Sequence, residues 1–376
     1  MIKMKRFDKQ ILVTRPFLPD LEAFKAGCEE IWRNQWLTNN GPMLQRFHTR
    51  LSEYLGVPET NLALFVNGTV ALEAAYYALG LSGGDVITTP FTFVATSHAL
   101  RRVGATPIFA DIDPETMCLD PRKVESLITS RTKAIVPVHV YGNICETETF
   151  DRLSRKYGIP IIYDAAHAFG VLNASACKNR CEMGHEWGDV SMFSFHPTKL
   201  FHSCEGGLLV FRDAALQSRL FDLRNFAIKS ETECTDVGMN GKMNELQALM
   251  GCLCLDHIDS ILAYRQRIYD AYADVFDARP EALTLVPHSA NKAYVPVLFR
   301  SSEARERVYA GLKACNVFSR RYFYPTLTDF APYCYGRGTC PIADDIASRI
   351  LTLPTYYGLP LEDVRDIAQN VLELVG

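Results

Sequence analysis

The stretch LALFVNGTVALEAAYYALG, residues 62–80, places a short apolar run, a polar turn and a helix-forming segment one after another. The short apolar run at 62–66 is typical of a buried strand, and the alanine- and leucine-rich segment at 69–80 favours a helix. Asn67 and Gly68 supply the turn between them. A buried strand that passes directly into a helix predicts one unit of an α/β fold.

The same alternation continues along the chain. Helix-like stretches such as 94–103 and 148–158 separate several further apolar runs. These runs are DVITT, PIFAD, KAIVPVHV, IPIIYD, DVSMFSF and GGLLVF, at residues 85–89, 107–111, 133–140, 159–164, 189–195 and 206–211. Continuous apolar strands that alternate with helices predict a mainly parallel sheet covered on both faces.

The pattern changes near residue 243. Residues 243–276 predict one long amphipathic helix, and after it a strand at 293–299 and a helix at 305–314 predict a smaller α/β unit. We therefore expect a large domain over residues 1–255, beginning with an N-terminal arm, and a small C-terminal domain over residues 256–376.

Composition narrows the class of protein. The 376 residues are 48% hydrophobic, which is enough for more than one core, and the net charge of -4 argues against a nucleic-acid partner. No secretory signal and no run of roughly 20 apolar residues is apparent, so we expect no membrane span. The 12 cysteines lack the paired spacing of a zinc site and predict reduced thiols in a cytoplasmic protein without a metal centre.

Polar or aromatic residues follow four of the predicted strands. In open parallel sheets, ligands bind beyond the carboxyl ends of the strands. The motifs at these four ends are VNGT, PFTF, DAAHAFG and SFHPTK, beginning at residues 66, 90, 164 and 194. We expect them to meet in one candidate site.

Two of these strand ends carry groups suited to an ionic ligand. Gly68 and Thr69 open a helix, where free N–H groups and the helix dipole attract a phosphate, although a plain helix cap would use the same residues. Asp164 ends an apolar strand, where a carboxylate needs a cation or donors. It would either cap the next helix or pair with a protonated group such as a pyridinium nitrogen.

Lys199 lies within SFHPTKLFHSCEGG, residues 194–207. A lone lysine is usually exposed, but one in a pocket of low dielectric has a lowered pKa and can form a Schiff base. Ser194 could bind phosphate, Gly206 and Gly207 allow close approach of the backbone, and Phe93 offers a stacking face. Together with the buried aspartate, these groups are what pyridoxal phosphate requires.

From about Phe17 to its C-terminus, the chain resembles the DegT-type sugar aminotransferases, fold-type-I pyridoxal phosphate enzymes that act on nucleotide-linked keto sugars. The matching motifs follow one another in register: NGTVALEAAYYALG, TPFTFVATSHAL, PIFADIDPETMCLDP, AIVPVHVYGN, DAAHAFG, FSFHPTK and GMNGKMNELQA. The resemblance implies an α/β fold with a large, mainly parallel sheet flanked by helices and a smaller C-terminal α/β domain.

Two segments resemble a subgroup of this family. WLTNNGP (36–42) and SFHPTKLFHSCEGG (194–207) are similar to the viosamine-forming enzymes, which aminate C4 of dTDP-4-keto-6-deoxyglucose. This resemblance implies transfer of an amino group from glutamate to that sugar. A 3-aminotransferase, a pyridoxal phosphate-dependent sugar dehydratase and a non-catalytic binding protein remain alternatives. Lys199 disfavours the dehydratase, because dehydratases of this fold often carry histidine at that position. The presence of both Lys199 and Asp164 disfavours a non-catalytic binding protein, which would be expected to have lost one of them.

The resemblance also implies roles for the site residues. Lys199 would bond to pyridoxal phosphate and move protons, Asp164 would hold the pyridine nitrogen protonated, and His167 would lie near the ring oxygen. Phe93 would stack on the ring. The phosphate would be held by Gly68, Thr69 and Ser194, with Asn240 reaching in from the second subunit of a homodimer whose active sites are shared.

A further set of residues matches regions that line the sugar site in the family, although loop packing would explain the same residues. We expect substrate contacts from this set, which comprises Asn39, His202, Lys242, Arg321 and Tyr322. At Lys242 the family often has arginine.

Overall fold

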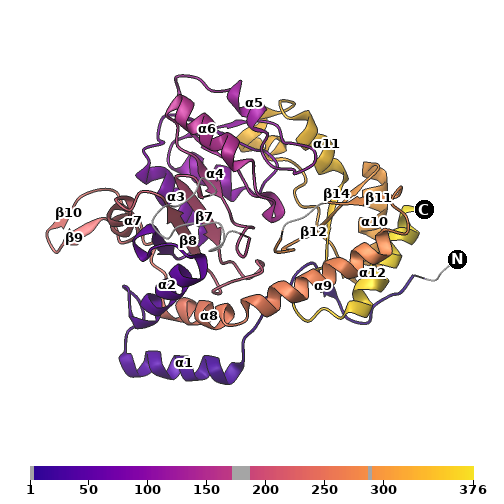
Figure 1. Ribbon diagram of the computed structural model, residues 1–376, viewed down its shortest axis with the longest axis horizontal. Helices are drawn as coiled ribbons and strands as arrows, with labels where there is room; N and C mark the ends of the chain where they lie inside the picture. The colour runs from indigo at the N-terminus through magenta and orange to yellow at the C-terminus, as the bar shows by residue number, and fades with distance from the viewer. Residues whose placement is uncertain (1–3, 172–186, 287–289) are drawn as a thin grey trace.

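The computed structural model describes residues 4–171, 187–286 and 290–376, and a seven-stranded sheet forms the centre of the larger unit (Figure 1). Two groups of strands, β2-β8-β7-β6 and β4-β3-β5, are joined by parallel bridges from Ile135 to Ile161 and from Val138 to Asp164. The strands are β2 (Leu62–Phe65), β3 (Asp85–Thr88), β4 (Thr106–Phe109), β5 (Thr132–Val136), β6 (Ile162–Asp164), β7 (Val190–Ser194) and β8 (Gly207–Phe211).

The sheet is mainly parallel, as predicted. Only β8 runs antiparallel to its neighbours β2 and β7. The segment between β7 and β8 contains no crossover helix, and a parallel return normally requires one. This segment, residues 195–206, carries Lys199.

Helices cover both faces of the sheet, because alternate strand residues are buried on opposite sides. In β2, Leu62 and Leu64 join the apolar cluster under α2, whereas Ala63 and Phe65 join the cluster under α3. The helices of this unit are α1 (Leu21–Asn34), α2 (Pro42–Leu55), α3 (Gly68–Ala78), α4 (Ala95–Arg102), α5 (Pro121–Glu125), α6 (Thr147–Tyr157), α7 (Leu216–Arg224) and α8 (Glu245–Leu255).

The single long helix predicted over residues 243–276 is wrong. The structure divides it into α8 and α9 (Ile258–Phe276), which meet at an angle of 61°. α8 packs against α1 and α2, whereas α9 packs against α12 (Leu361–Val375), so the break lets each helix follow its own core. Within the described residues, no single helix is long and apolar enough to cross a membrane, although α8 and α9 pass that test as a bent pair.

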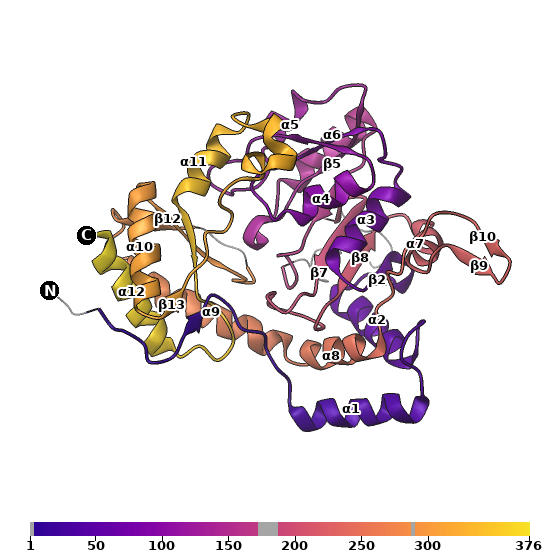
Figure 2. The same cartoon turned by 180° about the vertical axis from the view of Figure 1, so that it is seen from behind.

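The C-terminal unit is built on an antiparallel sheet ordered β11-β12-β14, and it also receives the N-terminal arm. β1 (Ile11–Leu12) pairs with β13 in this unit, and Phe7 lies in the same apolar cluster as α9 and α12. The N-terminal arm, which the sequence grouped with residues 1–255, thus packs against the C-terminal unit (Figure 2). The remaining elements are β11 (Leu283–Leu285), β12 (Val295–Phe299), β13 (Val317–Phe318), β14 (Ile350–Leu353), α10 (Ser302–Ala314) and α11 (Pro341–Arg349).

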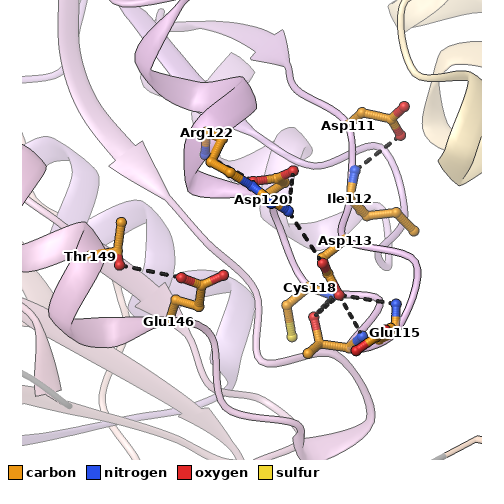
Figure 3. A network of polar contacts seen from close by, with 10 residues as sticks. Asp111, Ile112, Asp113, Glu115, Cys118, Asp120, Arg122, Glu146 and Thr149 are labelled. Atoms are coloured by element: carbon orange, nitrogen blue, oxygen red, sulfur yellow. Dashed lines mark hydrogen bonds and ion pairs between the residues drawn. The ribbon is translucent and has the colours of Figure 1, made fainter.

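Asp111, just after β4, links the larger unit to the C-terminal unit by hydrogen bonds. Its carboxylate accepts hydrogen bonds from the backbone N–H groups of Ile342 (3.0 Å) and Ala343 (2.9 Å) at the start of α11. The loop that follows Asp111 is held by Arg122, which forms ion pairs with Asp113 and Asp120 (Figure 3). The C-terminal unit is thereby held against the sheet that carries the candidate site.

A short hairpin projects from the larger unit. It consists of β9 (Ile228–Ser230) and β10 (Glu233–Cys234), and Figures 1 and 2 show it standing away from the body of the chain. Its strand residues are exposed in the single chain.

Candidate active site

A cavity of about 390 Å³ opens beyond the carboxyl ends of the parallel strands. The end of β6 contributes Asp164, the end of β7 contributes Ser194, and the start of α3 contributes Gly68 and Thr69. Its volume is within the range of about 300–1,000 Å³ found for small-molecule sites. The segment after β3 adds Thr92 and Phe93, so the four strand ends singled out in the sequence meet around one cavity.

The turn into α3 is arranged for an anionic ligand. The side chain of Asn67 caps the helix by accepting from the N–H of Val70 at 2.9 Å. The cap therefore comes from Asn67, and the first-turn N–H groups of Gly68 and Thr69 have no partner within the helix. A β-carbon on Gly68 would lie 3.2 Å from the β-carbon of Ser194, so glycine lets these two phosphate-binding candidates approach closely.

Asp164 is buried, with 4% of its surface exposed. It accepts hydrogen bonds from the hydroxyl of Thr96 (2.7 Å) and from the N–H of Ala166 (3.1 Å). Burial raises the pKa of this carboxyl group, and these two hydrogen bonds together with Lys199 oppose the rise. The bond to Ala166 is the local cap, but a desolvated carboxylate at the cavity would also stabilise a cationic ligand group.

Lys199 is half-buried in the cavity wall and is not the exposed lysine of the alternative interpretation. Its Nζ donates to the hydroxyl of Tyr294 at 3.3 Å. Burial lowers the pKa of this amine, Tyr322 and Asp164 oppose the shift, and Arg320 adds to it. A lowered pKa increases the fraction of neutral, nucleophilic amine near neutral pH.

His167 is held as a neutral ring. The N–H of Tyr141 donates to its Nδ1 at 3.2 Å, so the neutral ring carries its proton on Nε2. Burial lowers the pKa of His167 well below its ordinary value. The ring lies parallel to that of Phe323 and edge-on to that of Tyr294, which fixes its orientation beside the cavity.

Two predicted aromatic residues also line the cavity. Phe93 has 52% of its surface exposed there, an uncovered apolar face that a ligand ring could occupy. Tyr322, from the C-terminal unit, also lines the cavity, near Arg320.

Two further predicted substrate contacts, His202 and Arg321, are not among the residues that line this cavity. His202 is 2% exposed, its Nε2 donates to the carbonyl of Phe17 at 2.6 Å, and its Nδ1 accepts from the N–H of Cys204. Arg321 turns away from the cavity toward Glu306 and lies over the ring of Tyr309. Both side chains are therefore used in packing.

Three other predicted residues lie outside the cavity of their own chain. Asn39 is exposed in a turn with φ of 63°, and Asn240 is exposed after the β9–β10 hairpin. Lys242 donates to the side chain of Asn225 at 2.8 Å. Asn240 is expected to serve a neighbouring chain, so its position here leaves that prediction open.

Sequence reasoning missed several residues of the site. Arg320 lines the cavity, whereas the prediction named its neighbour Arg321. Tyr294, at the start of a predicted strand, and Thr96, one turn after Phe93, were recognisable as polar residues near predicted motifs. Their contacts with Lys199 and Asp164 join segments far apart in the sequence, and no local pattern signals them.

Residues 20–372 match the family described as the DegT/DnrJ/EryC1/StrS aminotransferase family. A dTDP-4-amino-4,6-dideoxy-D-glucose transaminase from Shigella dysenteriae is 40% identical, with coverage of 98% of this chain and 100% of that relative. A transaminase of the same name from Escherichia coli is also 40% identical, with coverage of 97% and 99%.

Solved structures show the same similarity. The structure of DesI, determined in the presence of its TDP-sugar product, superposes on this chain with a TM-score of 0.88 at 33% sequence identity. The superposition covers 99% of this chain and 94% of the DesI chain. Helicobacter pylori PseC, an aminotransferase involved in the biosynthesis of pseudoaminic acid, superposes with a TM-score of 0.86 at 27% identity, with coverage of 97% and 99%.

Proposed function

The chain belongs to the DegT/DnrJ/EryC1/StrS aminotransferase family, and on that premise we propose that it transfers the amino group of glutamate to C4 of dTDP-4-keto-6-deoxyglucose. The observation that carries the proposal is that Lys199 and Asp164 line the same cavity as the N-terminus of α3. The names of the two relatives at 40% identity support C4 of a dTDP-linked sugar over C3.

Family membership confirms the predicted fold of type I and the pyridoxal phosphate cofactor. The residues present fit this cofactor. The N–H groups at Gly68 and Thr69 and the hydroxyl of Ser194 would hold its phosphate, and the buried carboxylate of Asp164 would hold its pyridine nitrogen protonated. When bound, the cofactor supplies an electron sink for the carbon that loses a proton.

The chain's own residues would then handle the protons. Lys199, whose pKa is lowered by burial, would remove the proton from the donor carbon and return one to the acceptor side in the second half of the reaction. Tyr294 accepts a hydrogen bond from the same amine and would keep it aimed at the cavity. Phe93 would cover one face of the ring, and neutral His167 would donate from Nε2 near the ring oxygen.

The proposal includes a homodimer with shared sites. Large apolar side chains are exposed on α1, on the segment that follows it and around the projecting hairpin. They include Leu21 and Trp32 on α1, Trp36 and Leu37 after it, Phe226 and Ile228 at the hairpin, and Val237 beyond it. Exposed apolar groups on this scale support burial against a second copy, with Asn240 near the neighbouring site.

A substrate panel tests the proposal. Purified enzyme with pyridoxal phosphate and glutamate is incubated with dTDP-4-keto-6-deoxyglucose, a 3-keto isomer and a GDP-linked 4-keto sugar, and products are identified by mass spectrometry. We expect a 4-amino dTDP-sugar and 2-oxoglutarate, and no product with Lys199→Ala. Efficient use of the 3-keto isomer alone would overturn the assignment to C4.

A further inference from the structure

Arg320 is a cation at the active-site cavity that has no assigned role. It lines the main cavity and also a small adjoining pocket that contains Tyr294, Tyr322 and Thr198. Its guanidinium lies 5.5 Å from the centre of the Tyr322 ring. Because its charge contributes to lowering the pKa of Lys199, it lies within electrostatic reach of the reacting amine.

The backbone of Arg320 is fixed by β14. Its N–H donates to the carbonyl of Thr352 at 3.0 Å, and its own carbonyl accepts from both the N–H (2.8 Å) and the hydroxyl (3.0 Å) of Thr352. These hydrogen bonds fix the position of the Arg320 backbone at the edge of the cavity. A fixed backbone position favours the defined side-chain geometry that an arginine needs to bind a ligand.

The neighbouring arginines differ from Arg320 in their partners. Arg321 and Arg305 both form ion pairs with Glu306. Among the described residues, no carboxylate lies within ion-pair distance of Arg320, although Asp164 and Glu205 line the same cavity. Asp164 is held by Thr96 and Ala166.

From this geometry we propose that Arg320 binds the carboxylate on Cα of the amino donor. The inference rests on the proposed use of an α-amino acid as donor. An arginine fork matches a carboxylate in two parallel hydrogen bonds. The carbon that loses its proton to Lys199 carries this carboxylate directly, so a cation close to Lys199 is suitably placed. The diphosphate of the sugar nucleotide lies a whole sugar ring away from the reacting carbon.

The adjacent arginine provides a matched control. Arg320→Gln, Arg320→Lys and Arg321→Gln holoenzymes are mixed with glutamate, and the first half-reaction is followed by cofactor absorbance in a stopped-flow instrument. We expect Arg320→Gln to raise the apparent Kd for glutamate about 30-fold or more, as for loss of a desolvated charge pair. Arg320→Lys should lose less, and Arg321→Gln should stay within about threefold of wild type.

Two further measurements distinguish binding of the amino donor from binding of the sugar nucleotide. The second half-reaction, started from aminated enzyme and keto sugar nucleotide, should lose much less than the first in Arg320→Gln. A change in the pKa of Lys199 would affect both halves alike, whereas loss of the contact to the donor carboxylate affects the first half alone. Binding of glutarate, an unreactive dicarboxylate, followed by calorimetry, should weaken in Arg320→Gln and not in Arg321→Gln.

Either of two results would overturn the inference: unchanged glutamate and glutarate binding in Arg320→Gln, or a loss confined to the sugar half-reaction, which would assign the arginine to the diphosphate. If wild type rejects glutamate but accepts another α-amino acid, the proposed donor is wrong. The inference then stands or falls on the loss that Arg320→Gln shows with that amino acid.

Discussion

Burial of the Asp164 carboxylate costs free energy of folding, and the same carboxylate has a proposed role in the reaction. Its carboxylate is desolvated, and its pKa is raised by burial. Asp164→Asn would remove the charge that holds the pyridine nitrogen protonated, and we expect kcat to fall by about a hundredfold or more, or about 3 kcal/mol of barrier. The cofactor-free variant should be at least as stable as wild type, because an amide is cheaper to bury than a carboxylate.

Steady-state kinetics and thermal unfolding of the cofactor-free protein check both parts. Asp113→Asn, in the loop after β4, serves as a control for a lost carboxylate away from the cavity. Near-normal turnover of Asp164→Asn would show that the carboxylate only caps the following turn through Ala166.

His139 predicts how stability depends on pH. It is fully buried against Tyr163, its Nδ1 accepts from the N–H of Cys145, and burial lowers its pKa to about 3. A histidine with a depressed pKa in the folded state stabilises the protein above the unfolded pKa near 6.5 and loses that contribution as pH falls toward 3. The free energy of unfolding should fall by about 1.4 kcal/mol per pH unit from this group alone between those limits.

Urea unfolding at about pH 7.5 and about pH 5 measures the slope. His139→Gln should be less stable at the higher pH but should lose less on acidification, because one fewer proton is taken up on unfolding. An unchanged slope in the variant would show that other groups dominate, among which His48, His167 and His202 also have pKa values lowered by burial.

At the scale of elements, the local sequence pattern predicted the strands of the large sheet and the turns that follow them. It did not predict that the connection between the two units consists of two separate helices, α8 and α9. β6 and β7 carry Asp164 and Ser194 at their ends, as apolar runs followed by polar residues indicate. The break at Asp256 and His257 was not predictable, because the helical pattern continues through it and the bend comes from packing against two different cores. Arg320 was not singled out for a related reason: local pattern does not show which of two adjacent arginines lines the cavity, and in the structure Arg320 does so.

The two adjacent glycines at the start of β8, Gly206 and Gly207, have different surroundings, and this predicts different effects of substitution. A β-carbon on Gly207 would lie 2.4 Å from the carbonyl oxygen of Asn67 and 2.9 Å from the α-carbon of Gly68, both in the turn proposed to hold the cofactor phosphate. Gly207→Ala should displace that turn, weaken pyridoxal phosphate binding by about tenfold or more, and cost about 1–3 kcal/mol of stability as overpacking does.

Gly206→Ala is the matched control. Its β-carbon would meet mainly side-chain atoms of Ser203 and Met243, which can move, so cofactor affinity should change less than in Gly207→Ala. Equilibrium titration of the cofactor-free variants with pyridoxal phosphate compares them. Equal affinities in both variants and wild type would mean that the turn is not constrained by β8.

At the scale of the whole molecule, a single chain leaves large apolar side chains exposed at the proposed site and on its projecting elements. Phe93 is uncovered at the cavity, and the β9–β10 hairpin projects beyond the fold just before Asn240 (Figure 1). A chain that acted alone would have no evident use for these exposed groups. Residues 36–42 and Lys242 also lie outside the chain's own cavity.

Subunit mixing tests whether the sites are shared. We expect Lys199→Ala and Asn240→Ala each to be strongly impaired as homodimers, the first for lack of the amine and the second for lack of a phosphate contact from the neighbouring chain. In a mixed dimer with shared sites, one site carries both lesions and the other carries neither. Co-expression with two different affinity tags and tandem purification should therefore recover about half of the wild-type activity per dimer, from statistical site counting on a two-fold symmetric assembly. If every site is built from one chain only, each site keeps one lesion and mixing restores nothing, and an Asn240→Ala homodimer of near-normal activity would by itself refute the contact.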